Sequence, residues 1–349
     1  MYQANFFDDK KRLMKVSKLG DPLERLNEVI DWDVFRPILK DALEKKHKGP
    51  GGRPAYDCIV LFKLLVIGRI YNISDDQLEY QTNDRVSFKR FIGLDTNADV
   101  PDAKTIWHFR NSLAEAAVMK KLFEVFDQKL EDERIITHKG TIIDATFVKV
   151  PIQRNTPDEN QQIKNGNIPP EWQEDVNKPK LRQKDTDARW TEKGGKSYFG
   201  YKDHVKVDSE SKMVENYTVT SASVHDSLEV PNLIKGNEQV LYADSAYAGK
   251  PVASALGENT RSEIHEKGNR KHPLTDEQKA RNNVKSRTRV RVEHVFGYMT
   301  NSLHGKSIRT IGLTRATFMI GLLNLVYNIC RYEIITRLKL VKGIAVSKI

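Results

Sequence analysis

The hydrophobic and polar positions follow two different periods along the chain, and the period changes near residue 134. Between residues 20 and 130, apolar residues recur at spacings of three and four, which is typical of amphipathic helices. Ser74 and the pair Pro101-Asp102 are of the residue types that begin helices. These observations predict an all-helical N-terminal domain over residues 1–133, with helices at Pro22–Val29, Asp33–Glu44, Tyr56–Tyr71 and Ser74–Thr82. Short helices joined by tight turns fit a DNA-binding helix-turn-helix, and they fit an ordinary helical bundle as well.

After residue 134, short runs rich in β-branched residues replace the helical pattern. Such runs predict strands. They occupy residues 140–149, 198–207, 213–220, 240–244 and, as an edge strand, 262–266. Between and after them, helical spacing returns at 226–233 and 250–256, and two long helices are predicted at 275–303 and 314–339. We therefore expect an α/β domain over residues 134–340, with a mixed sheet flanked by helices, and a C-terminal tail at 341–349.

Two polar segments interrupt this organisation. Lys48–Pro54 is rich in glycine, proline and basic residues, and we interpret it as a flexible loop between two helices. Residues 153–195 contain four prolines and show no clear periodicity. A connection of this length inside a compact domain is unusual. We interpret it as a partly ordered insertion that becomes ordered on DNA.

The charge balance favours a polyanionic partner. The 349 residues include 57 Lys and Arg against 47 Asp and Glu, a formal net charge of +10. Nucleic acid is the first partner to consider, although a basic protein without such a partner has the same composition. Only Cys58 and Cys330 are present, which excludes a disulfide framework or a zinc cluster. The N-terminus has no signal-peptide pattern, and the apolar runs Ile59–Ile70 and Phe318–Ile329 are too short to span a bilayer. We expect a cytoplasmic protein with no membrane partner.

Three carboxylates stand at distinctive places in the second domain. Asp144 is a lone charge in an apolar strand, Asp244 ends a short apolar strand, and Glu293 lies on a helix among basic residues. A charge in a buried strand is costly unless it is paired or binds a metal. Acids at the carboxyl ends of strands lie where open α/β sheets bind ligands. Carboxylate oxygens suit Mg²⁺ or Mn²⁺, and two such ions promote in-line phosphoryl displacement.

Each acid has an ordinary structural alternative. Asp144 could pair with an arginine, Asp244 could begin a turn, and Glu293 could pair with Arg289 one helical turn earlier. The order strand, strand, helix favours a shared metal site. The three side chains must then converge in space.

Five ordered motifs carry a resemblance to a known family. They are GTIIDAT at 140–146, YFGYKDH at 198–204, ASVHDS at 222–227, YADSAY at 242–247 and RVRVEHVFG at 289–297. On these motifs the chain resembles the DDE transposases of bacterial insertion sequences, in the IS-five-like branch with an RNase H-like core. The resemblance covers roughly residues 20 to 335. It implies an RNase H-like mixed sheet flanked by helices, with an all-α N-terminal DNA-binding domain.

The resemblance also implies roles for individual residues. Asp144, Asp244 and Glu293 match the three metal ligands, and Arg289 matches the arginine four residues before the glutamate. The family often has a tyrosine three residues before that arginine and a lysine seven after the glutamate. Here those positions are Ser286 and Thr300, and Lys306 lies out of register, so the usual lysine contact to the DNA end is missing from the pattern.

Several basic residues are candidates for phosphate contact. Lys202 and His204 are two apart on a predicted strand and so share a face. A structural role for His204 is an equal alternative. A run of cations also approaches Glu293 from its N-terminal side, and its density favours contact with the DNA backbone over a solvated face. The members that we assign to DNA are Lys285, Arg287, Arg289 and Arg291.

The expected function is metal-dependent cleavage at transposon ends, followed by strand transfer into target DNA. It requires double-stranded DNA and Mg²⁺ or Mn²⁺, with two ions expected, and we anticipate a homo-oligomer on DNA in the bacterial nucleoid. Two other functions remain open: an RNase H-like nuclease without joining activity, and a non-catalytic DNA-binding regulator. A recombinase with a covalent tyrosine or serine intermediate is not supported, because no arginine-histidine-tyrosine arrangement is evident.

Overall fold

The structure is a computed structural model that describes residues 8–44, 55–269 and 271–341. It divides into two compact units, one formed by residues 1–135 with 325–349 and the other by residues 136–324. The basic loop predicted at Lys48–Pro54, and all but the first residue of the tail predicted at 341–349, lie outside the described residues. The sequence-based boundaries at 133 and 340 stay predictions. The division differs from them by grouping the second half of the last helix with the helical unit.

The first unit is helical, as predicted. Asp21, Asp57, Ser74 and Asp102 begin helices, each accepting a backbone N–H bond from within the first turn. Its core is aromatic, with Phe35 and Phe62 fully buried and their rings 5.0 Å apart. The described helices are α1 (Asp8–Lys18), α2 (Pro22–Val29), η1 (Trp32–Phe35), α3 (Arg36–Glu44), α4 (Cys58–Tyr71), α5 (Asp75–Asp84), α6 (Val86–Ile92), α7 (Ala103–Glu115) and α8 (Met119–Asp132).

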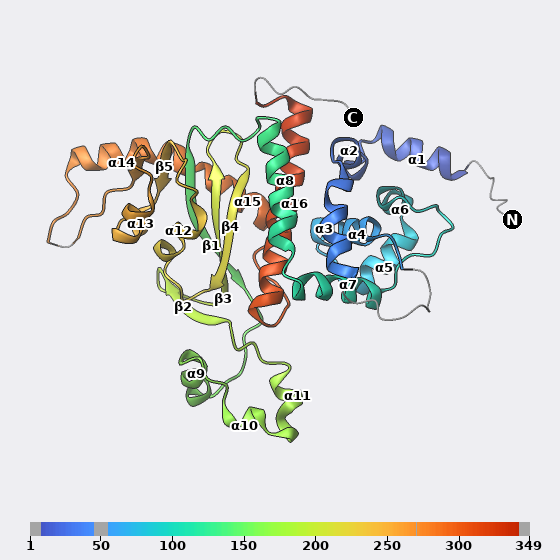
Figure 1. Cartoon of the computed structure of the whole chain (residues 1–349), viewed down its shortest axis with the longest axis horizontal. Coiled ribbons are helices and arrows are strands. Elements are labelled where there is room, and N and C mark those ends of the chain that lie inside the picture. The colour runs from blue at the N-terminus through green and yellow to red at the C-terminus, as the bar shows by residue number, and fades with distance from the viewer. Residues whose placement is uncertain (1–7, 45–54, 270, 342–349) are drawn as a thin grey trace. The chain divides into compact units, whose positions relative to one another are not determined.

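The second unit is built on a six-stranded mixed sheet (Figure 1). Its strands are β1 (Thr141–Lys149), β2 (Arg189–Lys193), β3 (Lys196–Asp208), β4 (Val214–Ser221), β5 (Val240–Ala243) and β6 (Arg261–Ile264). The order is β2-β3-β1-β5-β6, with β4 also paired to β3. Strands β1, β5 and β6 run parallel, and β3 is antiparallel to its neighbours. All five predicted strands are present, and the arrangement is the RNase H-like α/β fold that the motifs implied.

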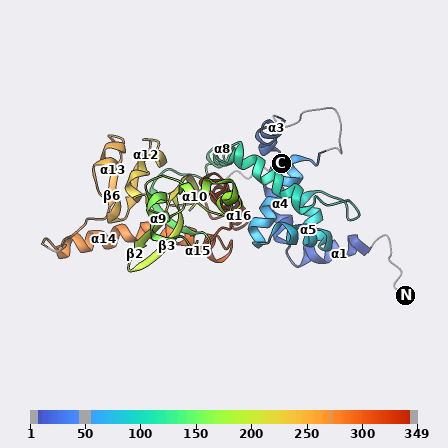
Figure 2. The same ribbon diagram turned by 90° about the horizontal axis from the view of Figure 1, so that it is seen from below.

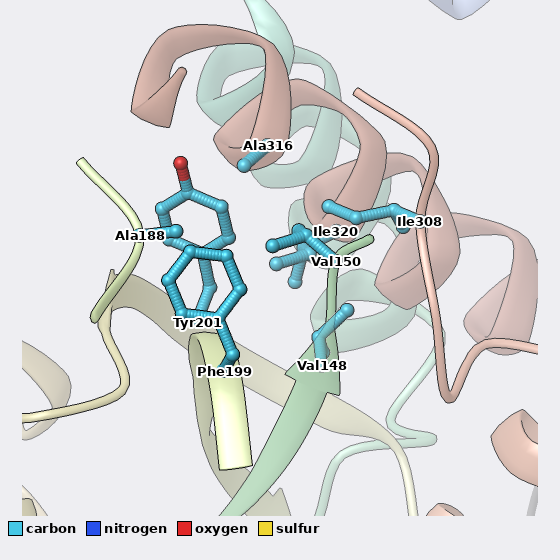
Figure 3. Close-up of a cluster of buried hydrophobic side chains, with 8 residues drawn as sticks. All are labelled: Val148, Val150, Ala188, Phe199, Tyr201, Ile308, Ala316 and Ile320. Carbon is cyan, nitrogen blue, oxygen red and sulfur yellow. The ribbon is translucent and has the colours of Figure 1, made fainter. Parts of the chain in front are cut away.

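Each face of the sheet is covered by its own helices. Ile143 and Leu241 pack with Val230 of α12 (Val230–Leu233) and Val252 of α13 (Lys250–Ala255) on one face. A second cluster joins Val148, Val150, Phe199 and Tyr201 to Ile308, Ala316 and Ile320, and Figure 3 shows these side chains directed toward the last helix. That helix, α16 (Leu313–Leu338), belongs to this unit as far as Asn324. Because both faces are covered, nearly every residue of β3 is buried.

Two helices follow one another along the sheet where a single one was expected. The predicted helix at 275–303 is divided into α14 (Asp276–Arg289) and α15 (Arg291–Asn301), as Figures 1 and 2 show. The interruption is Val290, whose N–H bonds to both Ser286 and Thr288 carbonyls. Arg289 therefore ends α14, and Glu293 lies on the first turn of α15.

The segment predicted as an unpatterned insertion has structure of its own. It contains α9 (Pro157–Lys164), α10 (Pro170–Gln173), η2 (Asp175–Asn177) and α11 (Lys178–Leu181), grouped near β2 in Figure 1. Trp172 is fully buried at its centre and donates to Glu159, while Lys180 and Lys184 lie over its ring. The helices are only one or two turns long, which is too short to show periodicity in the sequence. Residues 189–193 are not insertion at all, because they form β2.

One described helix has the length and composition of a membrane span. This helix is α16, and 72% of its most apolar window is buried inside the protein. Burial of that extent is what a core helix shows, so the composition alone is weak evidence for a membrane.

Candidate active site

The two aspartates are carried by neighbouring parallel strands of the sheet. Strands β1 and β5 run parallel, with Ile142 beside Tyr242 at the end of their ladder. Asp144 lies two residues further along β1. Asp244 follows directly after β5, and its side chain accepts a hydrogen bond from the Ala246 N–H at 2.8 Å, which begins the turn η4 (Ser245–Tyr247). The two acids are close enough for the charge of Asp244 to act on Asp144, and their role in one metal site stays a prediction.

Asp144 is held in a costly position. Its residue is 9% exposed, and its carboxylate accepts from the Ala145 N–H at 2.8 Å and from Arg289 Nη1 at 3.1 Å. Burial raises the pKa of Asp144 to about 6, with the charges of Asp244 and Glu293 adding to the rise and that of Arg289 opposing it. Both other acids are thus close enough to act on it electrostatically.

Arg289 stands between the acids. The same Nη1 that bonds to Asp144 lies 3.8 Å from Oε1 of Glu293, whose side chain is 55% exposed. The Arg289 Nε is buried and has no hydrogen-bond partner among the described residues. The guanidinium therefore supplies positive charge where three carboxylates approach one another. The salt bridge to Glu293 proposed from the sequence as an ordinary alternative exists, but as part of this larger group.

The donor set suits a divalent cation, although its geometry is open. Carboxylate oxygens on two adjacent strands and one helix are the ligands that Mg²⁺ and Mn²⁺ prefer. Within the described residues, no three histidine, cysteine or acidic side chains lie close enough together to hold a metal ion as they stand. Glu293 is exposed on the first turn of α15, and its charge acts on Asp144. The three residues fit the ion by the chemistry of their oxygen donors.

Lys202 and His204 do share a face, but it is the opposite face from Asp144. The register pairs Lys202 with Phe147 and His204 with Ala145, and side chains alternate along β1. Both residues are buried. Lys202 donates to Asp226 at 2.8 Å, and His204 bonds to Thr220 at 2.8 Å. Burial lowers the pKa of His204 to about 4, which keeps its ring neutral. The structure gives these two side chains no free surface for the expected phosphate contact, because both are buried and bonded within the protein.

The basic residues before Glu293 differ in availability. Lys285 donates to the Ile264 carbonyl, and Arg291 donates to the Ser209 carbonyl at 2.7 Å, so both brace the sheet. Arg287 is exposed and has no bonded partner in the described part of the chain. Sequence spacing alone does not separate these cases, since their neighbours come from distant strands. Of these four predicted cations on α14 and α15, Arg287 is the exposed one without a bonded partner among the described residues.

His265 is a site residue that the motif analysis missed. It follows β6 as Asp244 follows the neighbouring parallel strand β5, and its N–H donates to the Ala243 carbonyl. Its Nε2 lies 3.2 Å from Ser286 Oγ. Burial, reinforced by the charge of Arg289, lowers the pKa of His265. The rule that places functional groups at the carboxyl ends of parallel strands would have found it.

Comparison with known proteins gives concordant matches along most of the chain. Residues 136–329 match a family described as a transposase DDE domain, and residues 11–112 match one described as a transposase domain (DUF772). Among solved structures, the chain is similar to a piggyBac transposase in a synaptic complex with hairpin DNA. That likeness has a TM-score of 0.44 and 12% sequence identity, and covers 93% of this chain and 77% of the other. The family matches carry the argument below, and this distant structural likeness does not.

Proposed function

The chain belongs to the DDE transposase family, a family of DNA-cutting and strand-transferring enzymes, and we propose that Asp144, Asp244 and Glu293 carry its chemistry. The observation that supports this most directly is that Asp144 and Asp244 are carried by adjacent parallel strands, two residues beyond the last pair of the ladder, and that their charges interact. The raised pKa of Asp144 supports it too, because strained carboxylates gather at catalytic sites.

The family uses divalent metal ions. We infer Mg²⁺ or Mn²⁺ here, with two ions, held by the three carboxylates. Such ions activate a water and stabilise the departing 3′ oxygen in phosphodiester displacement. No covalent link between protein and DNA is needed.

The protein's own contribution is position and charge. Asp144 is oriented by hydrogen bonds from the Ala145 N–H and from Arg289. Asp244 is fixed in the same way by its own turn. In the absence of metal and DNA, Arg289 neutralises part of the negative charge of the acids. Once a metal ion supplies that positive charge, the guanidinium is suited to binding a phosphate. We assign Arg287, two residues earlier and exposed, to the DNA backbone, and its exposure supports this assignment.

The site assignment can be tested by strand transfer with pre-cleaved ends. Variants Asp144→Asn, Asp244→Asn and Glu293→Gln should each lose at least about 100-fold in joining a 3′-hydroxyl end to target DNA with Mg²⁺ or Mn²⁺, since each removes a charged ligand. They should bind the same DNA with nearly wild-type affinity. Glu277→Gln is the matched control, because Glu277 is an exposed acid on the same helix as Arg289.

The outcomes separate the alternatives. Near-normal joining by any of the three variants removes that residue from the site. A wild-type protein that hydrolyses DNA with metal but never joins a supplied 3′-hydroxyl would be the nuclease considered above. Action as a homo-oligomer that pairs two transposon ends, and membership of the IS-five-like branch, remain our proposals.

A further inference from the structure

A stacked aromatic pair surrounded by lysines lies on the sheet face opposite Asp144. The rings of Phe147 on β1 and Tyr198 on β3 are 4.4 Å apart and nearly parallel. Lys202 Nζ lies 5.3 Å from the Phe147 ring centroid and Lys193 Nζ lies 5.9 Å from it. Lys149 Nζ is 5.5 Å from the Tyr198 ring. Three ammonium groups are thus held around one pair of rings, which we call the lysine–aromatic patch.

The charges of this patch are mostly unbalanced. Lys202 is buried and paired with Asp226, so its positive charge is neutralised within the protein. Lys149 and Lys193 are exposed, and neither has an acidic side chain within ion-pair distance among the described residues. Cation–π contact fixes an ammonium group but leaves its charge intact. The patch therefore presents positioned positive charge to solvent.

A tight hairpin adds a further cation. Lys193 pairs in register with Lys196 across the turn between β2 and β3. The turn residues Gly194 and Gly195 both have positive φ, at 60° and 72°, which only glycine adopts readily. This geometry brings two exposed lysines directly opposite one another. Like charges in that position destabilise a hairpin unless an anion lies between or near them.

The patch also adjoins the proposed active site along the chain. Lys149 is five residues beyond Asp144 on the same strand, or roughly 17 Å at 3.3–3.4 Å for each residue. The ladder between β1 and β5 covers only Thr141 and Ile142, so β1 continues past the carboxylates without that neighbour. The next described partner on the backbone is the segment Lys306–Ile308, which bonds to both the N–H and the carbonyl of Lys149. The stretch from Asp144 to Lys149 thus links the carboxylates to the patch.

We propose that the lysine–aromatic patch grips the phosphodiester backbone of duplex DNA at a point separate from the catalytic carboxylates. The ligand class is a polyanionic strand with regularly spaced phosphates, since the ring faces are already covered by ammonium groups and are closed to stacking bases. The rings hold the exposed Lys149 and Lys193, and the hairpin sets Lys196 opposite Lys193, so little side-chain freedom is lost on binding. This inference rests on the proposed function, because it takes DNA as the substrate.

The test measures how DNA affinity depends on salt. The variant Lys149→Gln/Lys193→Gln is compared with the wild type for binding of a fluorescent duplex by anisotropy, in Mg²⁺-free buffer over a range of KCl concentrations. Each lost phosphate contact reduces the slope of log K against log salt by about 0.9, so the double variant should show a slope smaller by about 1.8. The half-saturating DNA concentration in the cleavage assay should rise as well.

Two further variants keep the result interpretable. Lys149→Arg/Lys193→Arg retains both charges and should keep the wild-type slope, which separates charge from local packing. Lys139→Gln/Lys164→Gln removes two exposed charges elsewhere in the same unit, Lys139 before β1 and Lys164 at the end of α9. This control should also keep the wild-type slope.

Each outcome has one meaning. A reduced slope in the glutamine variant alone supports the patch. An unchanged slope in that variant, or an equal reduction in the Lys139/Lys164 control, overturns it while leaving the proposed function intact. Failure of the wild type itself to cut or join DNA with metal would instead overturn the proposed function.

Discussion

Replacing Asp144 by asparagine should make the metal-free protein more stable at alkaline pH. The side chain is buried, and its pKa is raised from an ordinary value of 3.8 to about 6. Keeping it ionised in the folded state therefore costs about 3 kcal/mol, at 1.36 kcal/mol for each pKa unit. Asparagine has nearly the same shape and carries no charge. The variant should escape this cost and lose the ability to hold a cation.

The sign of the pH dependence follows from linkage. A carboxyl whose folded pKa exceeds its unfolded value is penalised only where it is ionised in the folded state. The penalty is absent below about pH 4, grows between pH 4 and 6, and is complete above pH 6. Asp144→Asn should thus match the wild type at pH 4 and exceed it at pH 8. In a unit of this size, about 3 kcal/mol corresponds to an increase of roughly 6–12 °C in Tm.

Thermal unfolding at pH 4, 6 and 8, in the presence of a chelator, measures this difference. Adding Mg²⁺ at pH 8 should raise the Tm of the wild type, because the ion neutralises the buried Asp144 carboxylate. The Tm of Asp144→Asn, which lacks that carboxylate, should not change. Asp175→Asn is the control, since the Asp175 side chain is 88% exposed. A variant no more stable than wild type at pH 8, or equally advantaged at pH 4, would refute the claim that Asp144 is held at a cost.

Three further substitutions test other parts of the structure. Arg289→Gln removes the cation 3.1 Å from Asp144 and should move the pH midpoint of metal-dependent cleavage upward by about one to two units. Arg281→Gln should leave the midpoint unchanged, because its partner Glu266 is not one of the three acids. An unchanged midpoint in Arg289→Gln would contradict the electrostatic role. Lys206→Met leaves Glu215 and Glu238 buried without their shared counter-charge and should cost about 3–5 kcal/mol in urea unfolding, a loss that would be much smaller if the network were hydrated. Gly200→Ala would bring a Cβ into collision with the Val148 carbonyl oxygen at a φ of 144°, so a destabilisation of about 1–3 kcal/mol is expected, and wild-type stability would show that the strand can shift there.

The fold was predictable where a local pattern had one interpretation. Strands β1 and β5 are short apolar runs that each carry or precede a single acid, and that combination is what indicates Asp144 and Asp244 as candidates in the sequence. The helices of the first unit begin at residues that cap them, such as Ser74 and Asp102. In these cases the residues that determine the structure are neighbours in the sequence.

Prediction failed where the deciding partner is distant in the sequence. The spacing of Lys202 and His204 correctly placed them on one face of the sheet. Most of β3 is buried on both faces, however, and the alternation of side chains does not tell whether a face packs against protein or binds substrate. Likewise, Lys285 and Arg291 look like Arg287 in the sequence, and only the carbonyls of Ile264 and Ser209 distinguish them. A charge run gives the number of cations but not their availability.

Arg289 was partly predictable from the sequence and partly not. Its place four residues before Glu293 suggested a role in the site, but not that one guanidinium would contact acids from both β1 and α15. The contact with Glu293 has the four-residue spacing of a helix, whereas the contact with Asp144 depends on a strand that is distant in the sequence, which no periodicity indicates. Three polar groups of the site lack full partners. Asp144 is buried with a raised pKa, Glu293 is exposed, and Arg289 Nε has no hydrogen-bond partner among the described residues. Polar groups left in this condition are costly unless a ligand completes them, and a cation for the acids with a phosphate for the arginine would satisfy all three at once.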